Sequence, residues 1–133
     1  MKEPLLRKVD CLRIPVPELE AGLTFYRDQL GHDVLWRAET MVGLRMPESD
    51  AEIVLSMEPE GMEVDLLVAS AGAGAAAFEQ AGGRVIVPPF DIQIGKCTVV
   101  ADPWGNQLVL LDMSKGRLVT DESGHVVGTQ GSP

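Results

Sequence analysis

The sequence predicts an α+β fold built from two tandem β-α-β-β-β modules. The chain repeats itself once, because at an offset of 52 residues Gly22 aligns with Gly74 and Gly31 aligns with Gly83. Each half also begins with an alternating apolar and polar segment, followed by helical spacing and three more short alternating segments. A unit of this size buries a core poorly by itself, so we expect the two copies to pack together as one domain.

The first module is expected over about residues 8–57. Its first strand alternates, with apolar side chains on one face and Cys11 and Arg13 on the other. A helix follows, in which Phe25 and Tyr26 are expected to fill the core, and Gly31 stands where a left-handed C-cap is typical. Three short strands are then expected, near 34–37, 41–46 and 52–57.

The second module is expected over about residues 62–113 and repeats this order. Its first strand places Glu63 and Asp65 on the face opposite its apolar side chains. A helix of small residues follows over about 71–81. Pro88–Pro89 is expected to end the next strand. The strands of this module are expected near 63–68, 84–87, 96–101 and 107–111.

The length of 133 residues fits a single domain, which we expect over 1–133. After the second module the chain becomes polar and rich in glycine, over 114–133. Within this tail the stretch 117–127 carries Ser123-Gly124 at its centre, and we expect a small hairpin there.

Composition limits the classes of function. The net charge of −9 disfavours binding to nucleic acid and to anionic membranes. The chain lacks an apolar run of the ~20 residues that a membrane span needs, and its start lacks the pattern of a secretory signal. Cys11 and Cys97 fall in expected strands outside any Cys-x-x-Cys motif. We therefore expect a reduced, cytoplasmic protein without disulfides and without a nucleic-acid or membrane partner.

Two stretches carry a family resemblance. Residues 14–31 contain Pro-Glu-Leu-Glu-Ala-Gly-Leu-Thr-Phe-Tyr and end in Leu-Gly, and residues 101–111 contain the turn Asp-Pro-Trp-Gly-Asn. Together with the repeat, they resemble the vicinal oxygen chelate superfamily, which includes glyoxalases, bleomycin-resistance proteins and extradiol dioxygenases. The resemblance covers about 8–113. It implies a curved mixed sheet with a concave cleft for a small organic ligand, and a homodimer.

The same resemblance places the metal-ligand positions of the superfamily on four residues, namely Cys11, Val54, Glu63 and Val109. Val54 and Val109 have no donor atom, and a cysteine is a soft ligand that suits hard divalent ions poorly. We therefore expect no metal and assign no ligand. A shifted, oxygen-rich set made of Glu52, Glu63 and Gln107 keeps a divalent metal open as an alternative.

The contacts to the ligand are expected from the concave face. Arg13 and Asp65 occupy equivalent places in the two modules, and they either orient a polar ligand or form an ion pair with each other. Arg13 and Lys96 favour an anionic ligand, whereas Glu63 and Asp65 favour a cationic one. The full set of expected contacts is Cys11, Arg13, Val54, Glu63, Asp65, Lys96, Gln107 and Val109.

The resemblance thus implies a glyoxalase-like or bleomycin-resistance-like protein that binds a small organic molecule without a metal. No catalytic residue is assigned, and whether the protein is an enzyme stays open. One alternative is a metal-dependent lyase, isomerase or dioxygenase in which a carboxylate such as Glu63 moves a proton. The other is a structural or regulatory dimer that has no ligand.

Overall fold

The computed structural model describes residues 3–58 and 61–130. The chain divides into two compact units, one made of 10–64 with 119–127, and the other of 65–118 with residues near both chain ends. Each unit holds one β-α-β-β-β module, which confirms the predicted α+β class. Among the described residues, no helix is long and apolar enough to cross a membrane.

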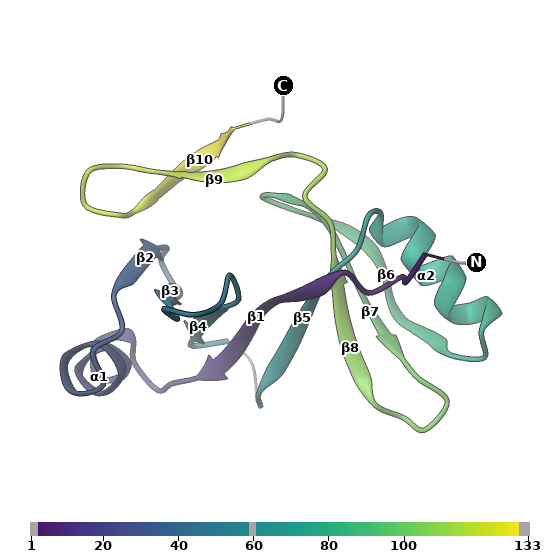
Figure 1. The fold of residues 1–133 in the computed structure, drawn as a ribbon, viewed down its shortest axis with the longest axis horizontal. Helices are drawn as coiled ribbons and strands as arrows, with labels where there is room; N and C mark the ends of the chain where they lie inside the picture. Colours follow the sequence, from purple (N-terminus) through teal and green to yellow (C-terminus); the bar gives the residue numbers. More distant parts are fainter. Residues whose placement is uncertain (1–2, 59–60, 131–133) are drawn as a thin grey trace. The chain divides into compact units, whose positions relative to one another are not determined.

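The first module is a four-stranded sheet with its helical segment on one face (Figure 1). The strand order is β2-β3-β4-β1, and β1 runs parallel to β4 while the other neighbours are antiparallel. The elements are β1 (Lys8–Pro15), α1 (Leu19–Leu23), the π-helix η1 (Thr24–Gln29), β2 (Val34–Arg37), β3 (Met41–Arg45) and β4 (Glu52–Ser56).

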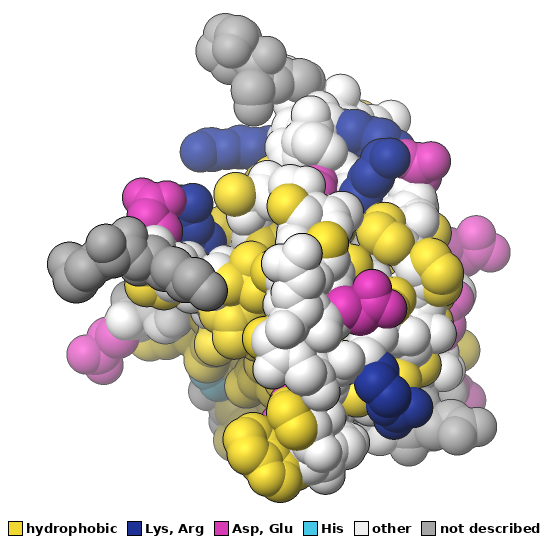
Figure 2. All heavy atoms as spheres, turned by 90° about the vertical axis from the view of Figure 1, so that its right-hand side faces the viewer, with side chains coloured by type: hydrophobic (Ala, Val, Ile, Leu, Met, Phe, Trp, Pro, Cys, Tyr) yellow, Lys and Arg dark blue, Asp and Glu magenta, His cyan; other side chains and the backbone are white. Residues whose placement is uncertain are grey.

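The second module repeats this arrangement with the order β5-β8-β7-β6, in which β5 runs parallel to β8. Figure 2 presents the side of the molecule on which α2 and β6 lie in Figure 1, and hydrophobic side chains reach the surface there between charged ones. On β6 the exposed hydrophobic residues include Ile86, Val87 and Phe90. The elements are β5 (Glu63–Leu67), α2 (Ala71–Gln80), β6 (Arg84–Ile92), β7 (Gly95–Ala101) and β8 (Gln107–Leu111).

Each module buries one face of its sheet under its own helix, as the alternation predicts. The first core contains Leu19, Leu23, Val42, Leu44, Ile53 and Leu55, with Ile14 and Val16 packed against it. The second contains Val68, Val100 and Leu110, with Leu66, Phe78 and Leu108 packed against it. Both helices approach the sheet at a glycine. A Cβ on Gly22 would lie 2.9 Å from Leu55, and one on Gly74 would lie 3.3 Å from Leu110.

The helix of the first module departs from the predicted spacing. It is α-helical only at its start and then continues as η1, in which the amide of Leu30 donates to the carbonyl of Phe25 at 3.1 Å. A π-helical turn holds more residues than an α-helical turn, so side chains rotate away from the expected stripe. Tyr26 packs against the core, but Phe25 is 52% exposed, and its predicted core position is wrong. Gly31 has the positive φ expected of a C-cap, at 86°.

Strand β6 is longer than predicted, because it continues through Pro88–Pro89 to Ile92. The prediction that these prolines end the strand is wrong. The register against β7 shifts between Val87 and Phe90, where the prolines lie, and β6 is the last strand of its sheet. Proline lacks the amide that a ladder needs, and edge strands and bulges are the places that tolerate it.

The tail forms the expected hairpin, from β9 (Arg117–Thr120) and β10 (Val126–Gln130). The turn between them is Asp121–His125. This turn belongs to the same compact unit as the first module. The amide of Arg37 on β2 donates to the carbonyl of Gly124 at 2.7 Å.

Candidate functional site

The polar groups of the first module gather on the sheet face opposite its helix, which we call the inner face. The register of β3, β4 and β1 arranges these residues in three rows. They alternate with the core residues of the same strands, so their side chains share one face. The first row is Arg45, Glu52 and Cys11, the second is Gly43, Val54 and Arg13, and the third is Met41 and Ser56.

Arg13 is held by protein groups on several sides. Its Nη1 donates to Oε2 of Glu63 at 3.1 Å, and its Nη2 donates to Sδ of Met41 and to Oγ of Ser56, each at 3.2 Å. A second carboxylate, that of Glu58, lies 3.8 Å from Nη2. Ser56 is fully buried, and the Arg13 side chain is 21% exposed.

These contacts bear on the two roles left open for Arg13. The guanidinium has a carboxylate, a hydroxyl and a thioether as acceptors, and Glu63 and Glu58 are among its ion-pair partners. Glu63, expected as a ligand contact, accepts a hydrogen bond from Arg13 through one of its two carboxylate oxygens. Because a partly buried guanidinium needs such partners, the arrangement fits a fixed structural group on the inner face.

Trp36 and Glu52 form a second polar pair, which the sequence analysis missed. The indole Nε1 donates to Oε1 of Glu52 at 2.6 Å. Trp36 reaches Glu52 because the strand between them carries Gly43, whose missing side chain leaves room for the indole: a Cβ there would overlap the ring. Glycine inside a strand often marks such a close approach, so Gly43 is the signal that could have found this pair.

The carboxyl of Glu52 has an unusual environment. Burial raises the pKa of Glu52 above its ordinary value, the hydrogen bond from Trp36 opposes that rise, and the nearby charge of Asp10 adds to it. Cys11 and Arg45 flank Glu52 in the register of the sheet. A half-buried carboxyl with one oxygen held by a protein donor is a typical binding or proton-transfer group.

The inner face of the second module is mainly apolar. Asp65, 7% exposed, and Val109, 8% exposed, are partners in the register of β5 and β8. Gln107 precedes Val109 by two residues on β8, so it shares this face at the strand's exposed start. The apolar residues clustered there are Leu67, Ile92, Ile94, Cys97, Val99, Val109 and Leu111.

Lys96 does not share that face. It neighbours Cys97 on β7, and successive side chains of a strand point to opposite sides of the sheet. Its exposed side chain therefore lies on the other face from Cys97 and Val109. Sequence analysis included Lys96 among the contacts of the concave face because its charge favours an anionic ligand, but its position in β7 places it on the opposite face.

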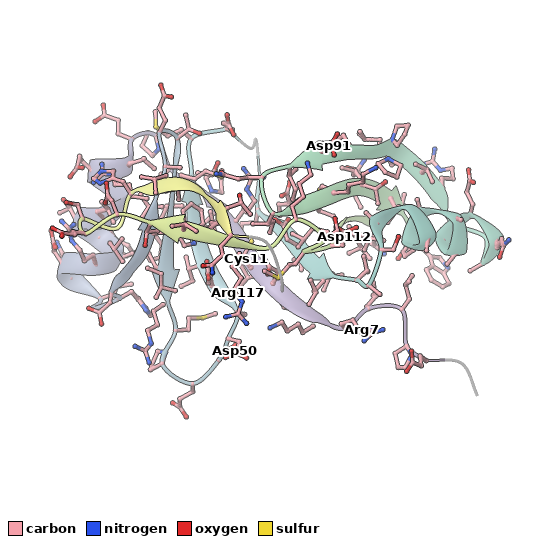
Figure 3. The ribbon with its side chains drawn as sticks, turned by 90° about the horizontal axis from the view of Figure 1, so that it is seen from above. Arg7, Cys11, Asp50, Asp91, Asp112 and Arg117 are labelled. Atoms are coloured by element: carbon pink, nitrogen blue, oxygen red, sulfur yellow. The ribbon has the colours of Figure 1, made fainter. Side chains whose placement is uncertain are left out.

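Asp112, at the end of β8, is a second polar group that sequence analysis missed (Figure 3). Its carboxylate accepts hydrogen bonds from the amide of Ala71 at 2.8 Å, the amide of Lys96 at 2.9 Å and the hydroxyl of Ser114 at 2.7 Å. Burial alone would raise the pKa of Asp112, but these hydrogen bonds hold it below its ordinary value. Its acceptors are occupied by the start of α2, by β7 and by Ser114, so its role is structural.

Within each module, the described donors of the inner face do not form a metal-ligand set. Val54 and Val109 offer no donor atom, one oxygen of Glu63 bonds to Arg13, and one oxygen of Glu52 bonds to Trp36. Among residues 3–58 and 61–130, no three His, Cys, Asp or Glu side chains are grouped closely enough to hold one ion. Divalent ions need several oxygen or nitrogen donors directed at one point.

Comparisons with known proteins agree with this architecture. Residues 8–110 match the family model described as Glyoxalase/Bleomycin resistance protein/Dioxygenase superfamily. No curated protein is similar enough to the chain to count as a match.

Several solved structures share the fold at low identity. Methylmalonyl-CoA epimerase from Mycobacterium tuberculosis is 17% identical, with a TM-score of 0.70 over 84% of this chain and 91% of that one. A Streptomyces coelicolor methylmalonyl-CoA epimerase variant is 19% identical, with a TM-score of 0.65 over 82% and 99%. Homoprotocatechuate 2,3-dioxygenase from Brevibacterium fuscum is 23% identical, with a TM-score of 0.63 over 83% and 37%.

Proposed function

Because the chain belongs to the glyoxalase/bleomycin resistance protein/dioxygenase superfamily, we propose that it binds a small organic molecule without a metal ion, using the inner face of its first module. The observation that carries this proposal is the Trp36–Glu52 pair. It sets a flat aromatic ring beside a half-buried carboxyl, and a 2.6 Å hydrogen bond fixes both groups. Small-molecule sites typically combine an apolar surface with a few polar groups of fixed orientation.

The charges of the inner face point to the chemistry of the ligand. The Arg13 guanidinium already donates three of its five N–H groups to Glu63, Met41 and Ser56, and a second carboxylate, that of Glu58, lies 3.8 Å from Nη2, so its charge is balanced within the protein. A carboxylate accepts about four hydrogen bonds, and the bond from Trp36 uses one of those of Glu52. We infer a ligand with an N–H donor or a cationic nitrogen next to a flat apolar part.

A second candidate is an isomerase that moves a proton. The raised pKa of Glu52 favours it, because acid–base groups commonly have such shifts. Under this candidate Glu52 would accept a proton from a bound substrate and return it. Methylmalonyl-CoA epimerases are among the structural neighbours of the chain. At 17–19% identity this similarity shows a shared fold and does not by itself support a shared reaction.

A paired ligand screen tests the proposal. Melting temperatures are measured with small aromatic amines and with the matching aromatic carboxylic acids, for the parent protein and for Glu52→Gln. The proposal predicts that amines raise the melting temperature of the parent and have little effect on Glu52→Gln. Lys96→Ala serves as control, since Lys96 lies on the other face of β7 and should leave the response unchanged.

The opposite result is equally clear. Stabilisation by the carboxylic acids alone, retained in Glu52→Gln and lost in Arg13→Met, would contradict the proposed ligand chemistry. Metal analysis of protein purified without chelator tests the proposal that binding needs no metal ion. Stoichiometric metal that is lost together with ligand binding would contradict metal-independent binding and favour the metal-dependent alternative.

A further inference from the structure

Two turns of this chain are built in the same way. In Asp102–Asn106, the Asp102 carboxylate accepts the amides of Trp104 and Asn106, each at 2.9 Å, and Gly105 has a φ of 90°. In Asp121–His125, the Asp121 carboxylate accepts the amides of Ser123 at 2.9 Å and of His125 at 3.0 Å, and Gly124 has a φ of 84°. Each aspartate thus closes its turn with its side chain, and each glycine adopts a backbone conformation that disfavours other residues.

The second of these turns pairs with a sheet edge. The amide of Arg37 donates to the carbonyl of Gly124 at 2.7 Å, and Arg37 forms a parallel bridge with His125. The four-residue strand β2 is the last strand on its side of the sheet, so the turn Asp121–His125 pairs with its open edge at Arg37. This turn lies beyond the residues 8–110 that match the superfamily.

The paired edge lies next to the candidate site. Arg37 directly follows Trp36, whose indole holds Glu52. The Arg37 side chain also forms an ion pair with Glu20 on α1, so its backbone and side chain are both anchored. Strand β2 is short and its register against β3 is interrupted between Val34 and Trp36. A short, bulged edge strand has little capacity to fix a large side chain by itself.

We propose that the turn Asp121–His125 is a positioning element that holds Trp36 against Glu52. Through its bond to Arg37, the turn fixes the end of β2 and thereby the indole above Gly43. Loosening the turn would free the indole while the core under the helix keeps its packing. The consequence for ligand affinity rests on the proposed function, but the effect on Trp36 itself does not.

Fluorescence of Trp36 provides a readout that needs no ligand. The chain has two tryptophans, so Trp104→Phe leaves Trp36 as the only tryptophan, which can be excited selectively over tyrosine. Titration of Glu52 changes the charge of the group bonded to the indole, and Glu52→Gln identifies that transition. The other groups that face Glu52 are Asp10 and Cys11 from β1, Arg45 from β3 and Trp36 from β2.

The test compares matched variants in the Trp104→Phe background of the full chain. Asp121→Ala and Gly124→Val disturb the turn on β2, and Asp102→Ala and Gly105→Val disturb its twin. The first pair should raise acrylamide quenching of Trp36 by about twofold and remove most of the Glu52-dependent change in fluorescence. The twin pair should leave both readouts at the parent level.

The outcomes separate this inference from the proposed function. Unchanged quenching and an unchanged pH response in both Asp121→Ala and Gly124→Val would overturn the positioning role. An equal effect of the twin variants would overturn it as well, because the cause would then be general loss of stability. A clear effect on Trp36 in a protein that binds none of the screened amines would support the positioning role and count against the proposed ligand class alone.

Discussion

Nε1 of Trp36 lies 2.6 Å from Oε1 of Glu52, and the strand between the two residues carries a glycine where the indole crosses it. This relationship joins β2 to β4 across β3 on the inner face of the first module. It places an aromatic surface and a carboxyl of raised pKa side by side. The pair, its environment and the core of each module can each be tested by substitution.

Replacing Gly43 by alanine should remove the indole from Glu52. The added Cβ would overlap the ring, so Trp36 must leave its place. We expect a loss of stability of about 1–3 kcal/mol and greater quenching of Trp36. Gly128→Ala on β10 is a matched control, because a Cβ there meets nothing within 4 Å. A Gly43→Ala protein with parent-like quenching would show that the indole has another stable position.

Glu52→Gln should change how stability depends on pH. A raised pKa means that the folded protein favours the protonated carboxyl, so this contribution to stability is present below the ordinary glutamate pKa and is lost as pH rises through the folded pKa. The amide side chain of the Glu52→Gln variant does not titrate. Urea denaturation should therefore show that the free energy of unfolding of Glu52→Gln rises relative to that of the parent between acidic and neutral pH. A Glu52→Gln variant that loses stability relative to the parent over the same pH range would contradict the raised pKa.

Asp112→Asn should destabilise the protein at neutral pH by about 2–4 kcal/mol, because an amide nitrogen replaces an oxygen that accepts buried donors. The lowered pKa of Asp112 stabilises the fold above the ordinary aspartate pKa, and this stabilisation is lost as pH falls through the folded pKa. The difference between parent and variant should thus shrink in acid. Asp28→Asn, at an exposed carboxylate, should change stability little. Equal effects of the two variants would contradict the structural role of Asp112.

The two helix glycines should respond differently to alanine. Alanine favours a helix over glycine by about 1 kcal/mol. At Gly22 the new Cβ would lie 2.9 Å from Leu55 and 3.1 Å from Val16, so overpacking should outweigh that gain. At Gly74 the nearest atom is 3.3 Å away, on Leu110, and Gly74→Ala should be neutral or slightly stabilising. Thermal denaturation of both variants checks the order, and the reverse order would contradict the packing of the cores.

Most of the fold could be predicted because its signals are local or repeated. The alternation of β1 separates Ile14 from Cys11 and Arg13, and the structure places them on opposite faces. The repeat aligns Gly22 with Gly74, and each packs against the leucine that its own module supplies. Alternation and internal repeats can be recognised in the sequence without knowing how the strands pair.

The site could be predicted less well because it depends on register. Trp36 meets Glu52 only because β2 carries a bulge between Val34 and Trp36, and because Gly43 lies between them. No local sequence pattern specifies the register of β2 against β3 or of β3 against β4. Lys96 is a different case, because alternation along β7 by itself places it on the face opposite Cys97 and Val99.

The most direct test of the central claim is an NMR titration of the Trp36 indole N–H with the strongest-binding aromatic amine from the screen. The account predicts a saturable shift of this signal in the parent protein, much weaker binding in Glu52→Gln, and little change in the Arg13 guanidinium signals. A saturable shift at Arg13 with no response of the Trp36 indole would contradict the account.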